Sequence, residues 1–386
     1  MKTYLEAEGI ELVNSGTDYF EVLERMIHES EHTLHLQTYI FEYDETGKRV
    51  IQALKNAVQR HVKVYVLIDA YGSYPVSHEM TDDLLQGGIH FRLFSPLFSS
   101  ESIFFGRRLH HKIIVADKRI ALTGGINIAD KYKGNSHSKA WLDYAVLTKG
   151  AVCEYLHLLC EEFYHEKRSP ALGSWERSID GQKKDQITGR VRYRRNDWIR
   201  RRNEIHKSYV EALLRAENSI VIVASYFLPG QKFRRLLQKA AARGVDIKII
   251  LAGKSDISSL HLAEHYLYEF YLRHRIQIYE WTDSVMHGKA MMTDKNWVTI
   301  GSYNLNFLSH YISIELNTEV LDPHFISSFA QHLDQVVRTN CRVVELKKPG
   351  DGANPFRRMK MWLAYTFYRW LMNGMMIGRK YRKRKK

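Results

Sequence analysis

The sequence is poor in cysteine, with three in 386 residues. Cys153, Cys160 and Cys341 form an odd set without the spacing of a disulfide framework, which excludes the small, disulfide-stabilised secreted proteins. Cys153 and Cys160 lie seven residues apart in a segment with helical periodicity, so we expect them on one core-facing side of a helix. No CxxC pair is present, and the sequence is interpreted as having neither a metal site nor a cofactor. These features are typical of a reduced, cytosol-facing protein.

The first residues also lack a long apolar run. In MKTYLEAEGIELVNSG (1–16), charged residues fall where a signal peptide has its apolar core. We therefore expect no export signal in this stretch.

Acidic residues are in the minority, with 43 Asp and Glu against 57 Lys and Arg, a formal net charge of +14. This imbalance predicts an anionic partner, which could be nucleic acid, acidic lipid or a membrane surface. A basic protein without such a partner is the alternative. A hydrophobic share of 45% and a charged share of 26% exclude a disordered chain, and the length allows about two domains.

Two segments repeat one pattern. LHHKIIVADKRIALTGGIN (109–127) contains His110, Lys112, Asp117, Gly124-Gly125 and Asn127. HGKAMMTDKNWVTIGSYN (287–304) contains their counterparts, each 177 positions later: His287, Lys289, Asp294, Gly301-Ser302 and Asn304. Two matches in the same register indicate an internal repeat.

The apolar stretches inside each segment predict two short strands joined by a turn at Lys118-Arg119 or Lys295-Asn296. Residues i and i+2 of a strand point to the same side, so each His is expected beside its own Lys. Docking the halves about a pseudo-twofold axis would bring two imidazoles and two ammonium groups together. Such a set suits a phosphodiester, which needs cations for its charge and groups that exchange protons near neutral pH.

Strand and helix patterns alternate in both halves of the chain. The sequence therefore predicts an α/β protein with mixed, mostly parallel sheets flanked by helices. The expected domains are a first repeat (1–170), a linker (171–189), a second repeat (190–348) and a C-terminal tail (349–386).

These motifs resemble those of the phospholipase D superfamily, whose signature His-x-Lys-x4-Asp-x6-Gly-(Gly/Ser)-x-Asn normally occurs twice. Within it, the chain is most similar to bacterial cardiolipin synthases of the type without N-terminal membrane spans. The similarity extends to TYIFEYDETG (38–47), LIDAYGS (67–73), SYFLPG (225–230) and LNTEV (316–320), and covers residues 8–345. The resemblance implies two phospholipase D-like α/β/α repeats related by a pseudo-twofold axis.

The resemblance also implies a two-step reaction through a phosphohistidine. One histidine attacks phosphorus while the other, protonated, donates to the leaving alkoxide and later deprotonates the acceptor alcohol. His110 is assigned as the nucleophile and His287 as the acid and base. The expected catalytic residues are the two motif triplets: His110, Lys112 and Asp117, and His287, Lys289 and Asp294. A structural role is favoured for the two aspartates, since each lies on the next turn of chain.

Supporting roles are implied for five further residues: Asn127, Asn304, Ser302, Asp143 and Glu319. The asparagines would help the lysines to stabilise charge on the non-bridging phosphate oxygens, or would simply cap turns. In the family an acidic residue after each motif orients a histidine. The matching positions are Asp143 and Glu319, with Glu315, four residues before Glu319, as the alternative.

The tail has apolar residues at helical spacing, mixed with basic ones. They are Met359, Trp362, Leu363, Phe367, Trp370, Leu371 and Met375. Lys360, Arg369 and Asn373 make a membrane-spanning helix costly, so an interfacial helix is favoured, with the terminal RKYRKRKK on anionic lipid. The alternative is a helix packed on the body of the protein.

The tail separates the candidate functions, because a nuclease does not need an aromatic interfacial helix. The prediction is a phosphatidyltransferase, specifically a cardiolipin synthase with phosphatidylglycerol as donor and a second phospholipid as acceptor. The alternatives are phospholipase D hydrolysis to phosphatidic acid and, third, nucleic-acid cleavage. The expected partners are phospholipid substrates and an anionic membrane surface, without nucleic acid. The expected location is the cytoplasmic face of a bacterial inner membrane, as a peripheral protein.

Overall fold

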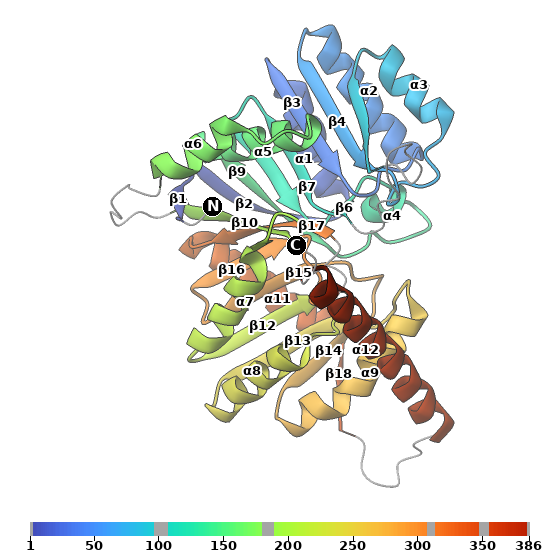
Figure 1. The fold of residues 1–386 in the computed structure, drawn as a ribbon, viewed down its shortest axis with the longest axis vertical. Helices are drawn as coiled ribbons and strands as arrows, with labels where there is room; N and C mark the ends of the chain where they lie inside the picture. The colour runs from blue at the N-terminus through green and yellow to red at the C-terminus, as the bar shows by residue number, and fades with distance from the viewer. Residues whose placement is uncertain (1–2, 96–106, 180–188, 307–312, 347–354, 384–386) are drawn as a thin grey trace.

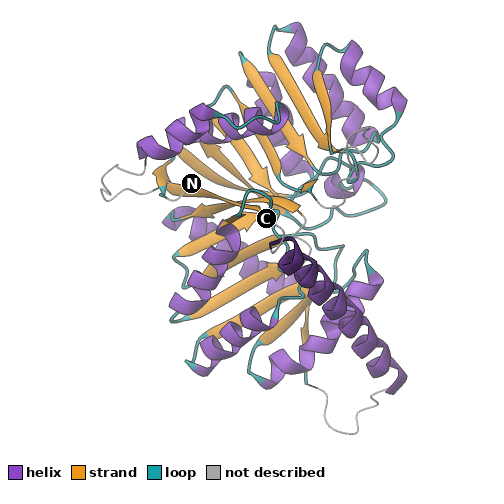
Figure 2. Ribbon diagram, in the orientation of Figure 1, coloured by secondary structure: helices purple, strands orange, loops and turns teal. Residues whose placement is uncertain are grey.

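The computed structural model describes residues 3–95, 107–179, 189–306, 313–346 and 355–383, with side chains in the last segment described as far as Leu371. Within these residues two mixed sheets, one largely from each repeat, carry helices on their faces (Figures 1 and 2). The predicted α/β class is confirmed.

Seven strands of the described chain form the first sheet. Their order is β2 (Gly9–Asn14), β9 (Tyr144–Lys149), β8 (Ile120–Gly124), β7 (Lys112–Ala116), β3 (Thr33–Thr38), β4 (Lys63–Asp69) and β5 (His90–Phe94).

Eleven strands of the described chain form the second sheet. The main path is β1 (Leu5–Glu6), β10 (Arg190–Asp197), β17 (Ser313–Val320), β16 (Trp297–Gly301), β15 (Lys289–Thr293), β12 (Ser219–Ala224), β13 (Asp246–Ala252), β14 (Gln277–Trp281) and β18 (Cys341–Val344). Two short strands lie off this path, β11 (Arg202–Asn203) beside β10 and β6 (Arg108–Leu109) beside β17. Strands β1 and β6 precede the second repeat in sequence, so the first half of the chain contributes two strands to the second sheet.

The expectation that the sheets are mostly parallel is wrong. Parallel pairing among the described strands is confined to β3–β4–β5, β12–β13–β14 and β6–β17. The motif segments are antiparallel hairpins, β7–β8 and β15–β16, which turn the chain back on itself. Asp117 and Lys118 form the first turn with φ of 51° and 60°, one residue earlier than predicted. Two central residues of positive φ match the right-handed twist of the adjoining strands.

Three apolar cores hold the layers together. Helices α1 (Thr17–Glu29) and α2 (Glu45–Gln59) pack on one face of the first sheet, and α3 (His78–Gln86) lies beside them. Helices α7 (Glu204–Arg215), α8 (Gln231–Ala242) and α9 (Ser258–Arg273) pack on the second sheet. A core shared by both sheets contains η1 (Ala151–Cys153), α5 (Glu154–Tyr164) and α11 (Pro323–Asn340). Cys153 and Cys160 are buried in this shared core, as predicted.

The predicted linker begins with a helix. Residues 171–179 belong to α6 (Pro170–Ile179), which packs against the shared core through buried Leu172. The ring of Trp175 lies 5.3 Å from that of Tyr155 on α5. Residues 180–188 of the linker lie outside the described residues.

The C-terminal tail is a helix, α12 (Pro355–Lys383), that runs along α9 (Figure 1). It is anchored by two tyrosines: Arg234 donates to Tyr365 Oη at 2.9 Å, and Tyr368 Oη lies 2.8 Å from Ser259 Oγ. One side of the helix therefore packs on the protein, as the second sequence-based alternative expects, and another side exposes apolar residues. Its placement at a membrane surface stays a prediction. Met375 lies outside the described side chains. No helix in the described part of the chain has both the length and the apolar character of a membrane-spanning segment.

Candidate active site

His110 of the first repeat is held by the second repeat. It lies between β6 and β7, and its backbone N–H donates to Ile314 O at 3.0 Å. Its Nδ1 lies 2.8 Å from Glu315 Oε2 at the start of β17. Because a carboxylate can only accept, the proton belongs on Nδ1, which leaves Nε2 free to react.

His287 of the second repeat is held by the first repeat in the same way. Its backbone N–H donates to Leu142 O at 2.7 Å, and its Nδ1 lies 2.6 Å from Asp143 Oδ2. Each imidazole therefore receives its orienting carboxylate from the opposite half of the chain. The site is complete only when the two halves dock.

Strand register shows why Glu315, and not Glu319, is the counterpart of Asp143. Gly124 pairs with Ala145 and Gly301 pairs with Asn317, so the residues two places earlier, Asp143 and Glu315, are equivalent. The resemblance implies Glu319, with Glu315 as the alternative, and Glu315 is the one that contacts His110.

The orienting role predicted for Glu319 is thus corrected. Its side chain is buried and accepts from Arg192 Nε and Tyr4 Oη, each at 2.8 Å. Residues 315 and 319 point to the same face of β17, but they lie four positions apart, about 13 Å along the strand, so the partners of Glu319 lie away from His110. Glu319 therefore belongs to an ion pair that joins β10 and β17.

The two lysines stand beside their histidines, as the strand pattern predicts. Lys112 Nζ donates to His110 O at 2.6 Å, and Lys289 Nζ makes the equivalent contact with His287 O. Lys289 Nζ also lies 2.9 Å from His287 Nδ1. Both ammonium groups are buried, so the site holds two cations in surroundings of low dielectric constant.

The glycine and serine of the motifs fit the two carboxylates. A Cβ atom on Gly125 would stand 2.3 Å from Asp143 Oδ1, so only glycine leaves room for this side chain. At the equivalent position of the second repeat, Ser302 Oγ donates to Glu315 Oε2. The supporting role of Ser302 is thus to hold the carboxylate that contacts His110.

The two asparagines bind the ends of neighbouring strands. Asn127 Oδ1 accepts from Ile40 N–H at 3.0 Å, and its Nδ2 donates to Tyr132 Oη at 2.7 Å. Asn304 Oδ1 accepts from Ser225 Oγ at 3.0 Å. These contacts fix the loops that carry the site.

Asp117 and Asp294 do not lie beside the histidines. Asp117 accepts backbone N–H groups of residues 31–33, and Asp294 accepts those of residues 217–219, all at 2.7–3.0 Å. Each aspartate thereby ties its hairpin turn to the start of β3 or β12. Their membership of the catalytic set is corrected to the structural role that the spacing favoured.

Aromatic rings that the sequence analysis did not select line the histidines. The Tyr39 ring lies 4.7 Å from that of His110, and the Tyr132 and Trp141 rings lie 5.3 Å and 6.1 Å from that of His287. Tyr39 follows Thr38, whose hydroxyl is near Asn127, just as Tyr226 follows Ser225 near Asn304. This repeated polar-Tyr pair after β3 and β12 is a signal that could have found Tyr39 and also Tyr226, whose ring lies 6.5 Å from that of His287.

A family model described as "Cardiolipin synthase, PLD-like domain" matches residues 23–148 and 209–337, which together make up more than half of the chain. The chain belongs to the phospholipase D-like cardiolipin synthase family.

Named relatives agree with this family assignment. The chain is 32% identical over 350 residues to cardiolipin synthase B of Escherichia coli (strain K12), covering 89% of this chain and 84% of that protein. It is 28% identical over 320 residues to cardiolipin synthase 1 of Bacillus cereus, covering 80% and 62%. Among solved structures, phosphatidylserine synthase of Haemophilus influenzae superposes with a TM-score of 0.72 at 15% identity over 96% of both chains, which supports the fold.

The electrostatics of this phospholipase D-like site favour neutral histidines in the absence of substrate. Burial lowers the pKa of His110 and of His287, and the adjacent lysines lower that of His287 further. Burial also lowers the pKa of Lys112 to about 7 and that of Lys289 to about 8, and raises the pKa of Asp143 to about 6. A phosphodiester bound between the lysines would favour their charged forms, because an opposite charge nearby offsets desolvation.

Proposed function

We propose that this protein is a phosphatidyltransferase that makes cardiolipin, with phosphatidylglycerol as donor and a second phospholipid as acceptor. Membership of the cardiolipin synthase family supports the proposal. The observation that carries it is the reciprocal pairing of His110 with Glu315 and of His287 with Asp143, beside two buried lysines. This arrangement supplies a nucleophile, an acid and two cations for one phosphorus atom.

In the first step, Nε2 of one neutral histidine attacks phosphorus and forms a P–N bond. The P–O bond to the leaving alkoxide breaks, and the other histidine, protonated, gives that oxygen its proton. In the second step this histidine takes the proton of the acceptor hydroxyl, whose oxygen attacks phosphorus as the P–N bond breaks. Lys112 and Lys289 stabilise the negative charge on the non-bridging oxygens throughout.

The assignment of His110 as nucleophile stays a prediction. The directions of the pKa shifts support the reverse assignment, because burial and then the lysines lower the pKa of His287 well below its usual value, whereas Glu315 opposes the lowering at His110, and a nucleophile must be neutral. Reactions with phosphatidylglycerol radiolabelled in its phosphatidyl group would distinguish them, if they are quenched with denaturant at alkaline pH, where a P–N bond persists. The variant that retains the nucleophile and lacks the acid would accumulate labelled protein, whereas His→Ala at the nucleophile would give none.

Single changes His110→Ala and His287→Ala should each reduce turnover by at least about 10²-fold, the lower end of general acid–base contributions. The assay incubates purified protein with phosphatidylglycerol vesicles, with and without phosphatidylethanolamine, and identifies products by mass. His137→Ala, on an exposed loop, is the matched control. Phosphatidic acid as the sole product would support the hydrolase alternative. Cleavage of single-stranded DNA with unaltered lipid would overturn the proposal.

We infer that the protein acts at the surface of a membrane, as a peripheral protein on the cytoplasmic face of a bacterial inner membrane. The support is the exposed side of α12. Six large apolar side chains project from it with exposed fractions of 48–69%: Phe356, Met359, Trp362, Leu363, Phe367 and Trp370. An amphipathic helix rich in Trp, Phe and basic residues is suited to the head-group region of anionic bilayers.

Replacement of Trp362 and Trp370 by Glu should weaken sedimentation with phosphatidylglycerol vesicles at least about tenfold, since two large apolar side chains are removed from the lipid contact. Activity on a short-chain soluble phospholipid should persist. A matched control changes exposed Leu85 and Leu214, which lie on other surfaces, to Glu. Equal vesicle binding by all three proteins would contradict the role of α12 while leaving the catalytic proposal intact.

A further inference from the structure

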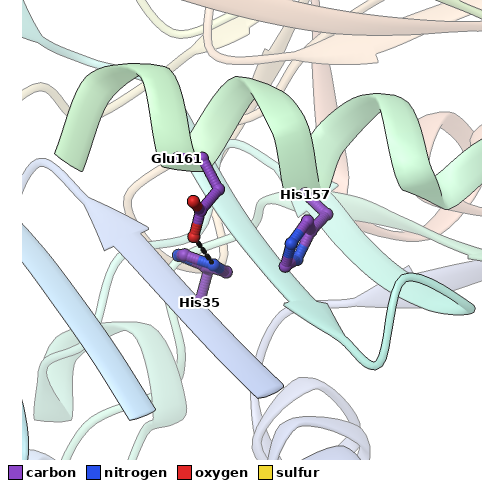
Figure 3. Close-up of side chains that lie close together, drawn as sticks. All are labelled: His35, His157 and Glu161. Atoms are coloured by element: carbon purple, nitrogen blue, oxygen red, sulfur yellow. Dashed lines mark ion pairs between the residues drawn. The ribbon is translucent and has the colours of Figure 1, made fainter. Parts of the chain in front are cut away.

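A second group of imidazole and carboxylate side chains lies apart from the active site. His35 is on β3, and His157 and Glu161 lie one helical turn apart on α5, which covers this part of the sheet (Figure 3). Their candidate ligand atoms all lie within 4.8 Å of one another. Among the residues that the structure describes, no other group of three or more His, Cys, Asp or Glu side chains lies close enough together to hold a metal ion.

Three ring nitrogens of this cluster are buried without a hydrogen bond. His35 is 0% exposed, and neither of its ring nitrogens has a hydrogen-bond partner among the described residues. His157, 7% exposed, likewise has an unpartnered Nδ1. Buried polar atoms are nearly always paired, so unpaired nitrogens on two adjacent rings require an explanation.

The separation of His35 and Glu161 is also compatible with two ligands of one ion. His35 Nε2 lies 3.1 Å from Glu161 Oε1 but lacks the alignment of a hydrogen bond. Two ligand atoms on a tetrahedral Zn²⁺, with bonds of about 2.0–2.1 Å, lie about 3.4 Å apart. Residues i and i+4 of a helix face the same side, so α5 presents both of its ligands to His35.

The ring of His35 is also fixed in place. It stacks on Tyr65 of β4 with centroids 4.8 Å apart, and Tyr65 stacks in turn on His90 of β5 at the same separation. The His157 ring meets that of His35 edge-on, with centroids 4.8 Å apart. Ligands carried on a strand and a helix and held by packing form a preorganised site.

We propose that His35, His157 and Glu161 bind a divalent transition-metal ion, Zn²⁺ being the best match to two imidazoles and one carboxylate. A water molecule would complete the coordination, since three protein ligands leave one position of a tetrahedral zinc ion open. The ion would join α5 to β3 as a structural staple. It takes no part in the phosphoryl chemistry, which occurs beyond the opposite end of β3, at Tyr39 and His110.

A sequence search for zinc motifs would miss this site, because its ligands come from segments more than 100 residues apart. Residues 28–32, HESEH, do have the HExxH spacing of a zinc motif. Helix α1 ends at Glu29, however, so His28 and His32 do not share a helix face.

The staple would also steady the contact between the two repeats. Glu162, next to the proposed ligand Glu161, pairs with Arg200 of the second repeat, and Phe163 lies in the core shared by both sheets. Metal binding to the folded state alone would therefore stabilise the whole molecule.

The test uses the full-length protein after treatment with a chelator. We expect one equivalent of Zn²⁺ to bind in isothermal titration and to raise the thermal midpoint. Co²⁺ should give the intense visible absorption of a tetrahedral site, and X-ray absorption of the Zn²⁺ form should show two imidazole nitrogens at about 2.0 Å. No stoichiometric binding, a sulfur ligand or an all-oxygen octahedral shell would overturn the proposal.

Substitutions of the proposed ligands test whether the ion binds at this cluster. His157→Gln and Glu161→Gln should each weaken Zn²⁺ binding at least tenfold, while His137→Gln, in an exposed loop, should not. Binding equal to that of the unchanged protein in both ligand variants would overturn the proposal. The X-ray absorption measurement needs no variant, so it decides the question even if a substitution prevents folding.

Discussion

Replacing Glu315 tests the pairing of each histidine with a carboxylate of the other repeat. In Glu315→Gln the amide oxygen can still accept from His110 Nδ1 and Ser302 Oγ, so the shape of the site is kept and only the charge is lost. In Glu315→Ala both contacts are lost. The two variants therefore separate the effect of charge from the effect of orientation.

The expected magnitudes differ accordingly. A hydrogen bond to a charged group contributes about 1.5–3 kcal/mol and a neutral one about 0.5–1.5 kcal/mol. Loss of charge alone should cost about 1–1.5 kcal/mol, which corresponds to a fivefold to tenfold lower rate. Loss of orientation in the alanine variant should cost on the order of 10²–10⁴-fold, the range of a general acid–base contribution.

The pH dependence gives an independent readout. Glu315 raises the pKa of His110 against the lowering effect of burial, so its removal lowers that pKa further. The limb of the kcat/KM profile that reports His110 should move to lower pH in Glu315→Gln.

Glu319→Gln is the matched control, because Glu319 pairs with Arg192 and does not contact His110. It should lower the thermal midpoint, since a buried ion pair is lost, while the folded fraction keeps its rate and pH profile. If Glu319→Gln were the variant that abolished turnover, and Glu315→Gln retained it, the register argument would be refuted.

Two further substitutions probe the space and the charge of the site. Gly125→Ala should reduce turnover at least about tenfold by displacing Asp143 from His287, because the new Cβ would stand 2.3 Å from Asp143 Oδ1; activity equal to that of the unchanged protein would show that the carboxylate has room to move. As pH rises through about 7 to 8, Lys112 and Lys289 lose charge, so kcat/KM should fall. Lys289→Arg, which stays charged, should move this falling limb to higher pH, and an unmoved limb would exclude Lys289 as its source.

Sequence reasoning reached the parts of the site that depend on local pattern. The spacing of His110 and Lys112 on one strand side, and its repetition 177 residues later, is enough to place each pair. The partner of each histidine is a tertiary property, set by the docking of β6 on β17 and by loop lengths that differ between the repeats. Glu315 and Glu319 are four residues apart on one strand, so only the ladder register distinguishes them.

The sequence pattern also did not predict the proportion of parallel and antiparallel strand pairs. Alternating strands and helices predicted parallel pairing, and β3–β4–β5 obeys this prediction. The motif hairpin adds β7 and β8 in the opposite direction, because a tight turn at Asp117 leaves no room for a crossover. In the tail, periodicity showed apolar residues at helical spacing but not which side of α12 would meet α9.

The exchange of carboxylates between the repeats has a consequence during synthesis. A nascent chain that has emerged only as far as β16 already carries both histidines and both lysines, yet it lacks Glu315 and the strand that places His110. Catalytic competence should therefore arrive late in translation, once β17 is available to pair with β6. A ribosome-bound intermediate would in this way be kept from attacking the lipids around it.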